Sequence, residues 1–307
     1  MLRPTIGCEV HAELKTATKL FCGCKNEFGG QPNTHCCPVC SGFPGTLPML
    51  NRKAVEFAVK AGLALHCEIN RFSKWDRKNY FYPDLPKAWQ TSQYDLPLCV
   101  GGYVEFTLDG EKKRVRLNRI HLEEDAGKLI HDGGVSRVDY NRCGVPLIEI
   151  VTEPDMHSAE EVTAFLAELK SVLKYTGVSD VKMQEGSLRC DVNLSVAEDG
   201  APLGTRTETK NLNSFRSVAF ETRRQIELLE SGGVVEQETR RFDDNRGIGY
   251  AMRSKEDAHD YRYFPEPDLM PVVFTDDDIA AIKNGIPELK DARCARYAAL
   301  GLPAYDA

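Results

Sequence analysis

Apolar and polar residues alternate with a period of two in several stretches of this chain, and this alternation limits the possible folds more than any other feature. In residues 6–13 every second residue is apolar, and the polar face carries Glu9, His11 and Glu13. This pattern is typical of a strand with one buried face. A solvated outer face is the ordinary explanation of such polar residues. A functional explanation therefore needs support from other strands.

The remaining segments predict more strands, with a few helices between groups of them. We expect helices at about 51–65, 158–177 and 215–232, hairpins at 103–120 and 186–214, a meander at 234–275, and an extended proline-rich loop at 76–97. The dipeptide Asp109-Gly110 is typical of a tight hairpin turn. Because the strands meet mainly through hairpins, the expected fold class is α+β with an antiparallel sheet.

Composition indicates an ordinary globular protein. The 307 residues are 42% hydrophobic and 28% charged, with a net charge of −7. Such a chain can bury about three quarters of its unfolded surface, in one large domain or two unequal ones. No uncharged run approaches the roughly 18 residues that a membrane-spanning helix needs, and no signal sequence is evident. We therefore expect a cytosolic protein with no membrane partner, and the net acidity argues against a general nucleic-acid-binding surface.

Four of the eleven cysteines form two short pairs. Cys22-Gly-Cys24 is followed, after twelve residues, by Cys37-Pro-Val-Cys40. In a reducing compartment this spacing predicts a tetrahedral zinc site rather than disulfides. Cys36 is a competing ligand, but the Cys-x-x-Cys spacing favours Cys37. Because both pairs lie in segments rich in Gly, Pro and Asn, the zinc would have a structural role; free buried thiols are the alternative.

Carboxylates recur on the expected strands. Glu149 lies inside the apolar run VPLIEIV, where a buried charge costs several kcal/mol unless it is paired or binds a cation. Other acids on or at the ends of expected strands are Glu9, Glu124, Asp191 and Glu208. His11 lies two residues after Glu9 on the same face of its strand. Gathered on one sheet, such oxygen ligands with one histidine would suit Mg²⁺ or Mn²⁺ held against phosphates. Each acid taken alone is also explained by a salt bridge.

Common nucleotide-binding motifs are absent from the sequence. It contains neither G-x-x-x-x-G-K-[ST] nor G-x-G-x-x-G. A P-loop and a Rossmann-type dinucleotide site are therefore excluded.

Several segments have distinctive sequences: GCEVHAEL, DRKNYFYPDLPK, HLEEDAGK, GVPLIEIVTEPD, TKNLNSF, QETRRFD and DYRYFPEPDL. Together they resemble the signature blocks of the B subunits of the aspartyl/glutamyl-tRNA amidotransferases, over essentially the whole chain. The resemblance implies a cradle-shaped catalytic domain at 1–292, similar in fold to glutamine synthetase and the guanidino kinases. It would contain the zinc loop at 22–40 and be followed by the start of a helical domain at 293–307.

The resemblance also implies an activity. In this family ATP phosphorylates the side-chain carboxylate of a Glu or Asp carried by a misacylated tRNA, and ammonia then displaces the phosphate. The ammonia comes from a glutaminase A subunit, and the same complex contains a small C subunit. Such phosphoryl transfer depends mainly on positioning and on neutralising charge. The sequence leaves open whether Glu-tRNA, Asp-tRNA or both are substrates.

Site residues follow from the same resemblance. The implied ligands of the catalytic Mg²⁺ are Glu9, His11, Glu124 and Glu149, with Glu208 and Asp191 at a second cation. The implied contacts to the phosphates of ATP are Arg189, Lys210, Arg262 and Lys78. Two other interpretations remain: a non-catalytic zinc-containing binding protein with solvated acids, and a different ATP-dependent ligase or kinase of the same fold.

Overall fold

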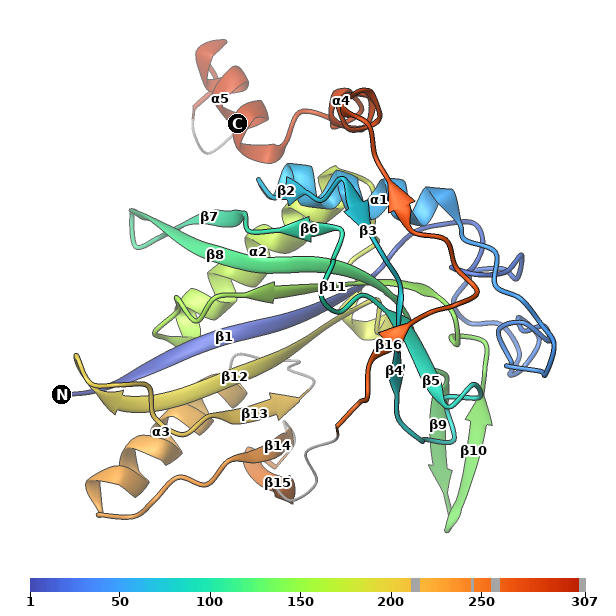
Figure 1. Cartoon of the computed structure of the whole chain (residues 1–307). Coiled ribbons are helices and arrows are strands. Elements are labelled where there is room, and N and C mark those ends of the chain that lie inside the picture. The colour runs from blue at the N-terminus through green and yellow to red at the C-terminus, as the bar shows by residue number, and fades with distance from the viewer. Residues whose placement is uncertain (211–215, 244–245, 255–259, 304–307) are drawn as a thin grey trace.

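The computed structural model describes residues 1–210, 216–243, 246–254 and 260–303, and its centre is a large sheet (Figure 1). The strands of this sheet are β1 (Leu2–Glu13), β2 (Glu68–Ile69), β6 (Cys99–Val100), β7 (Tyr103–Leu108), β8 (Glu111–Glu124), β11 (Pro146–Thr152), β12 (Leu188–Glu198), β13 (Thr207–Lys210), β14 (Glu238–Asp243) and β15 (Ile248–Ser254). Among the described residues their order is β15-β14-β13-β12-β1-β11-β8-β6-β2, with β7 on β8.

The predicted α+β class is confirmed, but the sheet is mixed rather than wholly antiparallel. β13 and β14 pair in parallel, whereas the other pairs described in this sheet are antiparallel. The reason is the helix α3 (Arg216–Glu230), which lies between these two strands in the chain. A crossover through a helix brings the second strand back in the same direction as the first. Residues 211–214 of the hairpin expected at 186–214 lie outside the described residues.

In the part of the chain that the structure describes, short strands form three further small sheets. β3 (Phe72–Ser73) pairs with β17 (Val272–Val273), β4 (Asp76–Asn79) pairs with both β5 (Trp89–Ser92) and β16 (Phe264–Pro265), and β9 (Lys128–Asp132) pairs with β10 (Val135–Asp139). The proline-rich segment expected as an extended loop thus contributes β4 and β5. It is held to the chain near residue 264 by β16.

The predicted helices at 51–65 and 158–177 are confirmed as α1 (Arg52–Ala64) and α2 (Ala159–Tyr175). Ser158 caps α2 by accepting a hydrogen bond from the backbone N–H of Glu161. The remaining helical elements are α4 (Asp276–Asn284), α5 (Lys290–Ala299) and the short 3₁₀ helix η1 (Met183–Glu185). α5 spans residue 293, at which the expected helical domain would begin.

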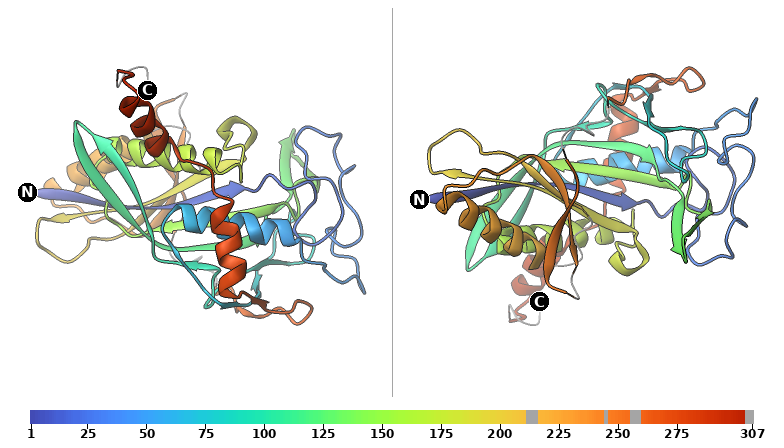
Figure 2. Two further views of the ribbon diagram at one scale, coloured as in Figure 1. Left: turned by 90° about the horizontal axis from the view of Figure 1, so that it is seen from above. Right: turned by 90° about the horizontal axis from the view of Figure 1, so that it is seen from below.

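The alternation in β1 gives the large sheet one apolar and one polar face. Ile6, Cys8, Val10 and Ala12 are fully buried in a core that they share with α1 and α2, for instance with Phe165. Burying a side chain such as Phe165 stabilises a fold by about 1.5–3 kcal/mol. Figure 2 shows α1 and α2 lying across the sheet, with α4 and α5 outside them. The polar residues of β1 consequently point to the opposite face.

Candidate functional site

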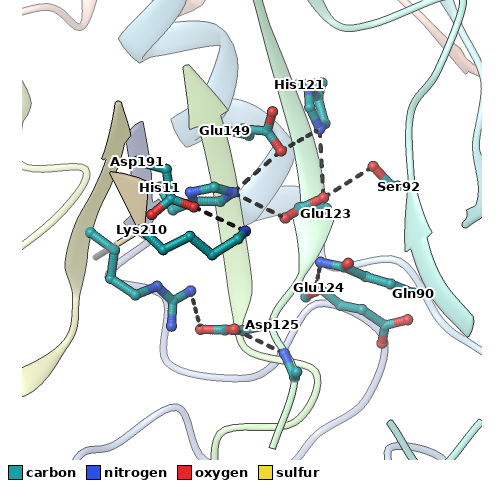
Figure 3. A network of polar contacts seen from close by, with 12 residues as sticks. His11, Gln90, Ser92, His121, Glu123, Glu124, Asp125, Glu149, Asp191 and Lys210 are labelled. Atoms are coloured by element: carbon teal, nitrogen blue, oxygen red, sulfur yellow. Dashed lines mark hydrogen bonds and ion pairs between the residues drawn. The ribbon is translucent and has the colours of Figure 1, made fainter. Parts of the chain in front are cut away.

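His11, Glu149 and His121 lie side by side on the polar face of the sheet. In the register of β1, β11 and β8, His11 is directly opposite Glu149, and Glu149 is directly opposite His121. Residues paired in this way share a face, with Cβ atoms about 4.5–5.5 Å apart. Glu123 follows His121 by two positions and therefore points the same way. We call His11, His121, Glu123 and Glu149 the His/Glu cluster (Figure 3).

Both histidines of the His/Glu cluster contact both carboxylates. Nε2 of His11 lies 3.3 Å from Oε2 of Glu149 and 3.9 Å from Oε1 of Glu123. Nε2 of His121 lies 3.5 Å from an oxygen of each carboxylate. Ser92 Oγ donates a 3.2 Å hydrogen bond to Glu123. Ligand atoms of His11, Glu123 and Glu149 all lie within 4.8 Å of one another, so these three residues can converge on one cation.

The cluster is buried and electrostatically coupled. Glu123 and Glu149 are only 2% and 7% exposed, and buried charges of this kind need compensation. Burial favours a higher pKa for Glu149, but the charges of His121 and His11 hold the pKa below its ordinary value. Burial favours a lower pKa for His11, but the hydrogen bond and charge of Glu149 raise it to about 9. At neutral pH a proton on His11 therefore balances the carboxylates.

The donor set suits a hard divalent cation. Two carboxylates and one imidazole leave room in a six-coordinate shell for water and phosphate oxygens, as Mg²⁺ usually requires. Mn²⁺ accepts the same donors. A cation bound to Nε2 of His11 would replace the proton there, since only the neutral imidazole is a ligand. The site then loses the single positive charge of the His11 proton and gains the double positive charge of the cation.

Lys78 approaches the cluster from β4, in a different sheet. Burial favours a lower pKa for this lysine, but the nearby charges of Glu123 and Glu149 raise it above its ordinary value. The ammonium lies 4.9 Å from the ring centre of Tyr261 and 5.8 Å from that of Tyr80. Lys78 thus supplies a permanent positive charge beside the carboxylates. Its predicted contact with phosphate stays a prediction.

Glu9, Asp191, Glu208 and Lys210 form a second polar group on the neighbouring strands. Nζ of Lys210 lies 3.1 Å from Glu208 and 3.4 Å from Asp191. Asn193 donates a 2.8 Å hydrogen bond to Glu9, whose pKa is raised chiefly by burial. In the structure the ammonium of Lys210 lies between the two acids for which a second cation was predicted. A lysine therefore already compensates their charge.

Glu124 is turned away from the His/Glu cluster. It forms an ion pair with Lys87 and accepts a 2.8 Å hydrogen bond from the backbone N–H of Thr91. Together with Lys87 it lines a separate cavity of about 330 Å³. Adjacent residues of a strand point to opposite faces, so the structure groups Glu123, and not Glu124, with His11. The sequence signal for Glu123 is its two-residue spacing from His121, which repeats the spacing of Glu9 and His11.

The two arginines predicted at the phosphates have different surroundings. Arg189 lies directly opposite His11 in the pairing of β1 and β12, and its Nη2 donates a 2.8 Å hydrogen bond to Asp125. Arg262 is exposed and has a positive φ of 43°. Within the described ranges no contact joins Arg262 to the His/Glu cluster. Arg189 is therefore the better placed of the two.

The four predicted cysteines come together. Their sulfur atoms all lie within 4.8 Å of one another, which confirms the grouping of Cys22, Cys24, Cys37 and Cys40. The backbone N–H of Cys37 and the ammonium of Lys19 approach Sγ of Cys40 at 3.2 and 3.5 Å. The pKa of Cys40 is lowered to about 4, first by a hydrogen bond with Cys22 and further by these two donors. A thiolate is the form that binds a metal, so the donor set fits zinc.

We expect one equivalent of zinc in protein purified without chelators, bound by the four cysteines at about 2.3 Å from each sulfur. Cys37→Ser should lower the zinc content to below half an equivalent and loosen the loop. Cys36→Ser is the matched control, because Sγ of Cys36 instead donates to the carbonyl of Asn33 at 3.3 Å. Elemental analysis of both variants makes the comparison. An equal loss of zinc from both would contradict the assignment.

Fold and site together define an α+β protein with a buried carboxylate–histidine cluster whose donors suit a divalent cation, and with a separate cluster of four cysteines that could hold a metal. The chain belongs to the family described as the GatB/GatE catalytic domain, which matches residues 4–280.

Curated relatives are similar along nearly the whole chain. The B subunit of the aspartyl/glutamyl-tRNA(Asn/Gln) amidotransferase of Caldicellulosiruptor bescii is 65% identical over 310 aligned residues, which cover 98% of this chain and 65% of the relative. The proteins of the same name from Lachnoclostridium phytofermentans and a Thermoanaerobacter species are each 60% identical with the same coverage. The chain thus spans 65% of the length of these relatives. Over the residues described, no helix is both long and apolar enough to cross a bilayer.

Proposed function

We propose that this chain is the catalytic part of a tRNA-dependent amidotransferase. It would phosphorylate the side-chain carboxylate of Glu or Asp on a misacylated tRNA at the expense of ATP, and then exchange the phosphate for ammonia. The observation that carries the proposal is the convergence of His11, Glu123 and Glu149 on one point of the polar face. Membership of the GatB/GatE catalytic domain family supports it.

The residues of the site fit the chemistry of the first step. His11, Glu123 and Glu149 would hold Mg²⁺, which when bound neutralises charge on the phosphoryl group being transferred. Lys78 and Arg189 would orient the anionic groups of ATP and of the substrate carboxylate, since both are cationic and border the cluster. The bound carboxylate oxygen attacks the γ-phosphorus of ATP. The bond to the β-phosphate oxygen breaks, and ADP leaves.

The second step converts the acyl phosphate into an amide. The nitrogen of ammonia attacks the acyl carbon, the carbon–oxygen bond to phosphate breaks, and one proton is lost. A carboxylate alone would not react in this way, because it is a poor electrophile with a poor leaving group. Burial of the cluster helps this step by keeping competing water away from the acyl phosphate.

The proposal extends to the organisation of the protein. We assign residues 1–292 to a cradle-shaped catalytic domain similar to glutamine synthetase and the guanidino kinases, and 293–307 to the start of a helical domain. The partners would be a glutaminase A subunit that supplies ammonia, a small C subunit, and misacylated tRNA, because the relatives are named as B subunits. Translation takes place in the cytoplasm, so the protein would act there.

The experiment that tests this function uses the full-length protein in its complex. Glu-tRNA(Gln) and Asp-tRNA(Asn) are each incubated with ATP and Mg²⁺, without glutamine, and hydroxylamine traps any acyl phosphate as a side-chain hydroxamate. This product is separated from the α-hydroxamate that hydroxylamine forms directly from the aminoacyl ester. We expect side-chain hydroxamate in a 1:1 ratio to ADP with at least one of the two tRNAs, and none with His11→Ala. The matched control is His131→Ala, because His131 is exposed on β9, in the separate β9–β10 sheet.

A non-catalytic binding protein would give a different result. It would bind misacylated tRNA and yet form neither ADP nor hydroxamate with either tRNA. A kinase or ligase for another substrate would form ADP independently of the amino acid on the tRNA.

A further inference from the structure

Five tyrosines form a continuous chain of ring contacts beside Lys78. Tyr94 stacks on Tyr263 with ring centres 4.4 Å apart, and Tyr263 meets Tyr261 edge to face at 6.0 Å. Tyr261 meets Tyr80 at 5.8 Å, and Tyr80 meets Tyr82 at 6.0 Å, again edge to face. We call these five residues the tyrosine belt. They come from three separate segments of the chain, which follow β4, follow β5 and precede β16.

Polar contacts hold the belt in place. Asn79 fixes the segment around Tyr261. Its backbone N–H donates a 3.0 Å hydrogen bond to the carbonyl of Tyr261, and its side-chain amide donates a 2.8 Å hydrogen bond to the carbonyl of Arg262. The carboxylate of the buried Asp76 accepts from the backbone N–H of Tyr94 at 2.9 Å. The hydroxyl of Tyr80 donates to Gln90 at 2.9 Å. The rings are therefore presented by a rigid support.

The backbone between two of the tyrosines is strained. Arg262, between Tyr261 and Tyr263, has a φ of 43°, which is uncommon for a residue with a side chain. Strain of this kind persists only where the surrounding structure enforces it, and it is concentrated at functional sites. A plain apolar cluster would not need it.

The belt runs from solvent past the candidate site and back to solvent. Its two end members are exposed, Tyr94 at 60% and Tyr82 at 47%, and Phe81 beside Tyr82 is 83% exposed. Near the middle the ammonium of Lys78 lies over the rings of Tyr261 and Tyr80. The same ammonium feels the charges of the His/Glu cluster. A ligand lying along the rings would thus reach the reacting groups.

We propose that the tyrosine belt is a stacking platform for the unpaired 3′ nucleotides of the tRNA acceptor end. Every base offers a π face, and exposed aromatic rings bind successive unpaired bases in this way. The belt contains more rings than one purine can cover, which favours several consecutive nucleotides over the adenine of ATP. Lys78 and the exposed Arg262 provide positive charge for the phosphates between the bases. The inference rests on the proposed function, because it takes tRNA as the substrate.

The test compares two RNA minihelices that share one duplex. One carries a four-nucleotide unpaired 3′ end with 2-aminopurine as its last base, and the other ends at the duplex. With the full-length protein in its complex, we expect 2-aminopurine fluorescence to be quenched on binding. Tyr94→Leu and Tyr82→Leu should each weaken binding of the tailed RNA roughly tenfold or more. Binding of the blunt RNA should not change.

Three controls make the result specific. Tyr94→Phe keeps the ring and should retain binding. Tyr250→Leu removes a tyrosine that is 45% exposed on β15, at the edge of the large sheet, and should have no effect. Thermal melting confirms that each variant is folded.

Other outcomes would overturn the platform. Tailed-RNA binding that is unchanged in both leucine variants, or that falls equally for tailed and blunt RNA, would show that the belt does not bind the unpaired end. Weaker binding of ATP with unchanged binding of RNA would assign the rings to the adenine of ATP. The hydroxamate assay at saturating tRNA separates a failure of the stacking platform from a failure of the proposed function. If only the platform is wrong, the His/Glu cluster would still form the acyl phosphate.

Discussion

Glu123→Gln is expected to lower the affinity for Mn²⁺ or Mg²⁺ sharply and to slow phosphorylation of the substrate carboxylate about a hundredfold or more. Glu123 is one of three residues whose ligand atoms converge within 4.8 Å. The amide keeps the shape of the side chain but removes its negative charge. A single group that stabilises developing charge in a transition state is worth roughly 10²–10³ in rate. Titration with Mn²⁺ by electron paramagnetic resonance and single-turnover formation of ADP measure the two effects.

Glu124→Gln is the control, because it changes the adjacent acid on the same strand. Its partners are Lys87 and the backbone of Thr91, on the other face of β8. We expect Glu124→Gln to retain the affinity for Mn²⁺ to within about threefold, as for a group that does not touch the cation. A large loss of Mn²⁺ affinity in Glu124→Gln together with normal affinity in Glu123→Gln would contradict the grouping.

The affinity for the divalent cation should rise steeply with pH. The pKa of His11 in the cation-free protein is raised to about 9 by the hydrogen bond and charge of Glu149, against the effect of burial. Below that pH the cation has to displace a proton from the imidazole, because metal ligands must be deprotonated. The apparent affinity should therefore increase about tenfold per pH unit up to about pH 9 and then level off. Calorimetric titration with Mg²⁺ between pH 6.5 and 9 measures the slope.

His11→Gln tests the origin of this slope, since glutamine does not titrate. The variant should bind more weakly at high pH and show little dependence on pH. An unchanged slope in His11→Gln would assign the proton to another group.

The raised pKa of His11 also makes the stability of the cation-free protein depend on pH. The folded pKa of His11 lies above the unfolded value of about 6.5. The protonated imidazole therefore contributes stability that is fully present below about pH 6.5 and is lost as the pH rises through about 9. Chemical denaturation with and without Mg²⁺ should show that the cation removes this loss.

Local patterns were sufficient to predict much of the fold. The alternation in residues 6–13 predicts β1, and Asp109-Gly110 predicts the turn between β7 and β8, where both residues have positive φ. Apolar periodicity predicts α1 and α2. The spacing of the four cysteines suggested one group, because each short pair holds its own two sulfur atoms close enough to chelate one ion. The meeting of the two pairs depends on the fold of the segment between them, which the structure shows.

The features that could not be predicted from the sequence depend on contacts between strands that are distant in the chain. Glu123 and Glu124 are adjacent acids, and the two-residue spacing of Glu123 from His121 selects Glu123 only once His121 is known to lie on the same face as His11. That choice depends on the register of β8 against β11, in which Glu149 is opposite His121. A shift of one residue would exchange the two acids. Lys210 between Asp191 and Glu208, and the parallel pairing of β13 and β14, depend in the same way on contacts across the sheet.

The most direct test of a cation-assisted phosphoryl-transfer site is to locate the cation. Crystals of the full-length protein in its complex, soaked with Mn²⁺ and a non-hydrolysable ATP analogue, would be measured at the manganese absorption edge. We predict an anomalous peak about 2 Å from Nε2 of His11 and from carboxylate oxygens of Glu123 and Glu149, with phosphate oxygens of the analogue completing the shell. A well-bound nucleotide with its Mn²⁺ elsewhere, for instance at Glu124 or between Asp191 and Glu208, would contradict the assignment.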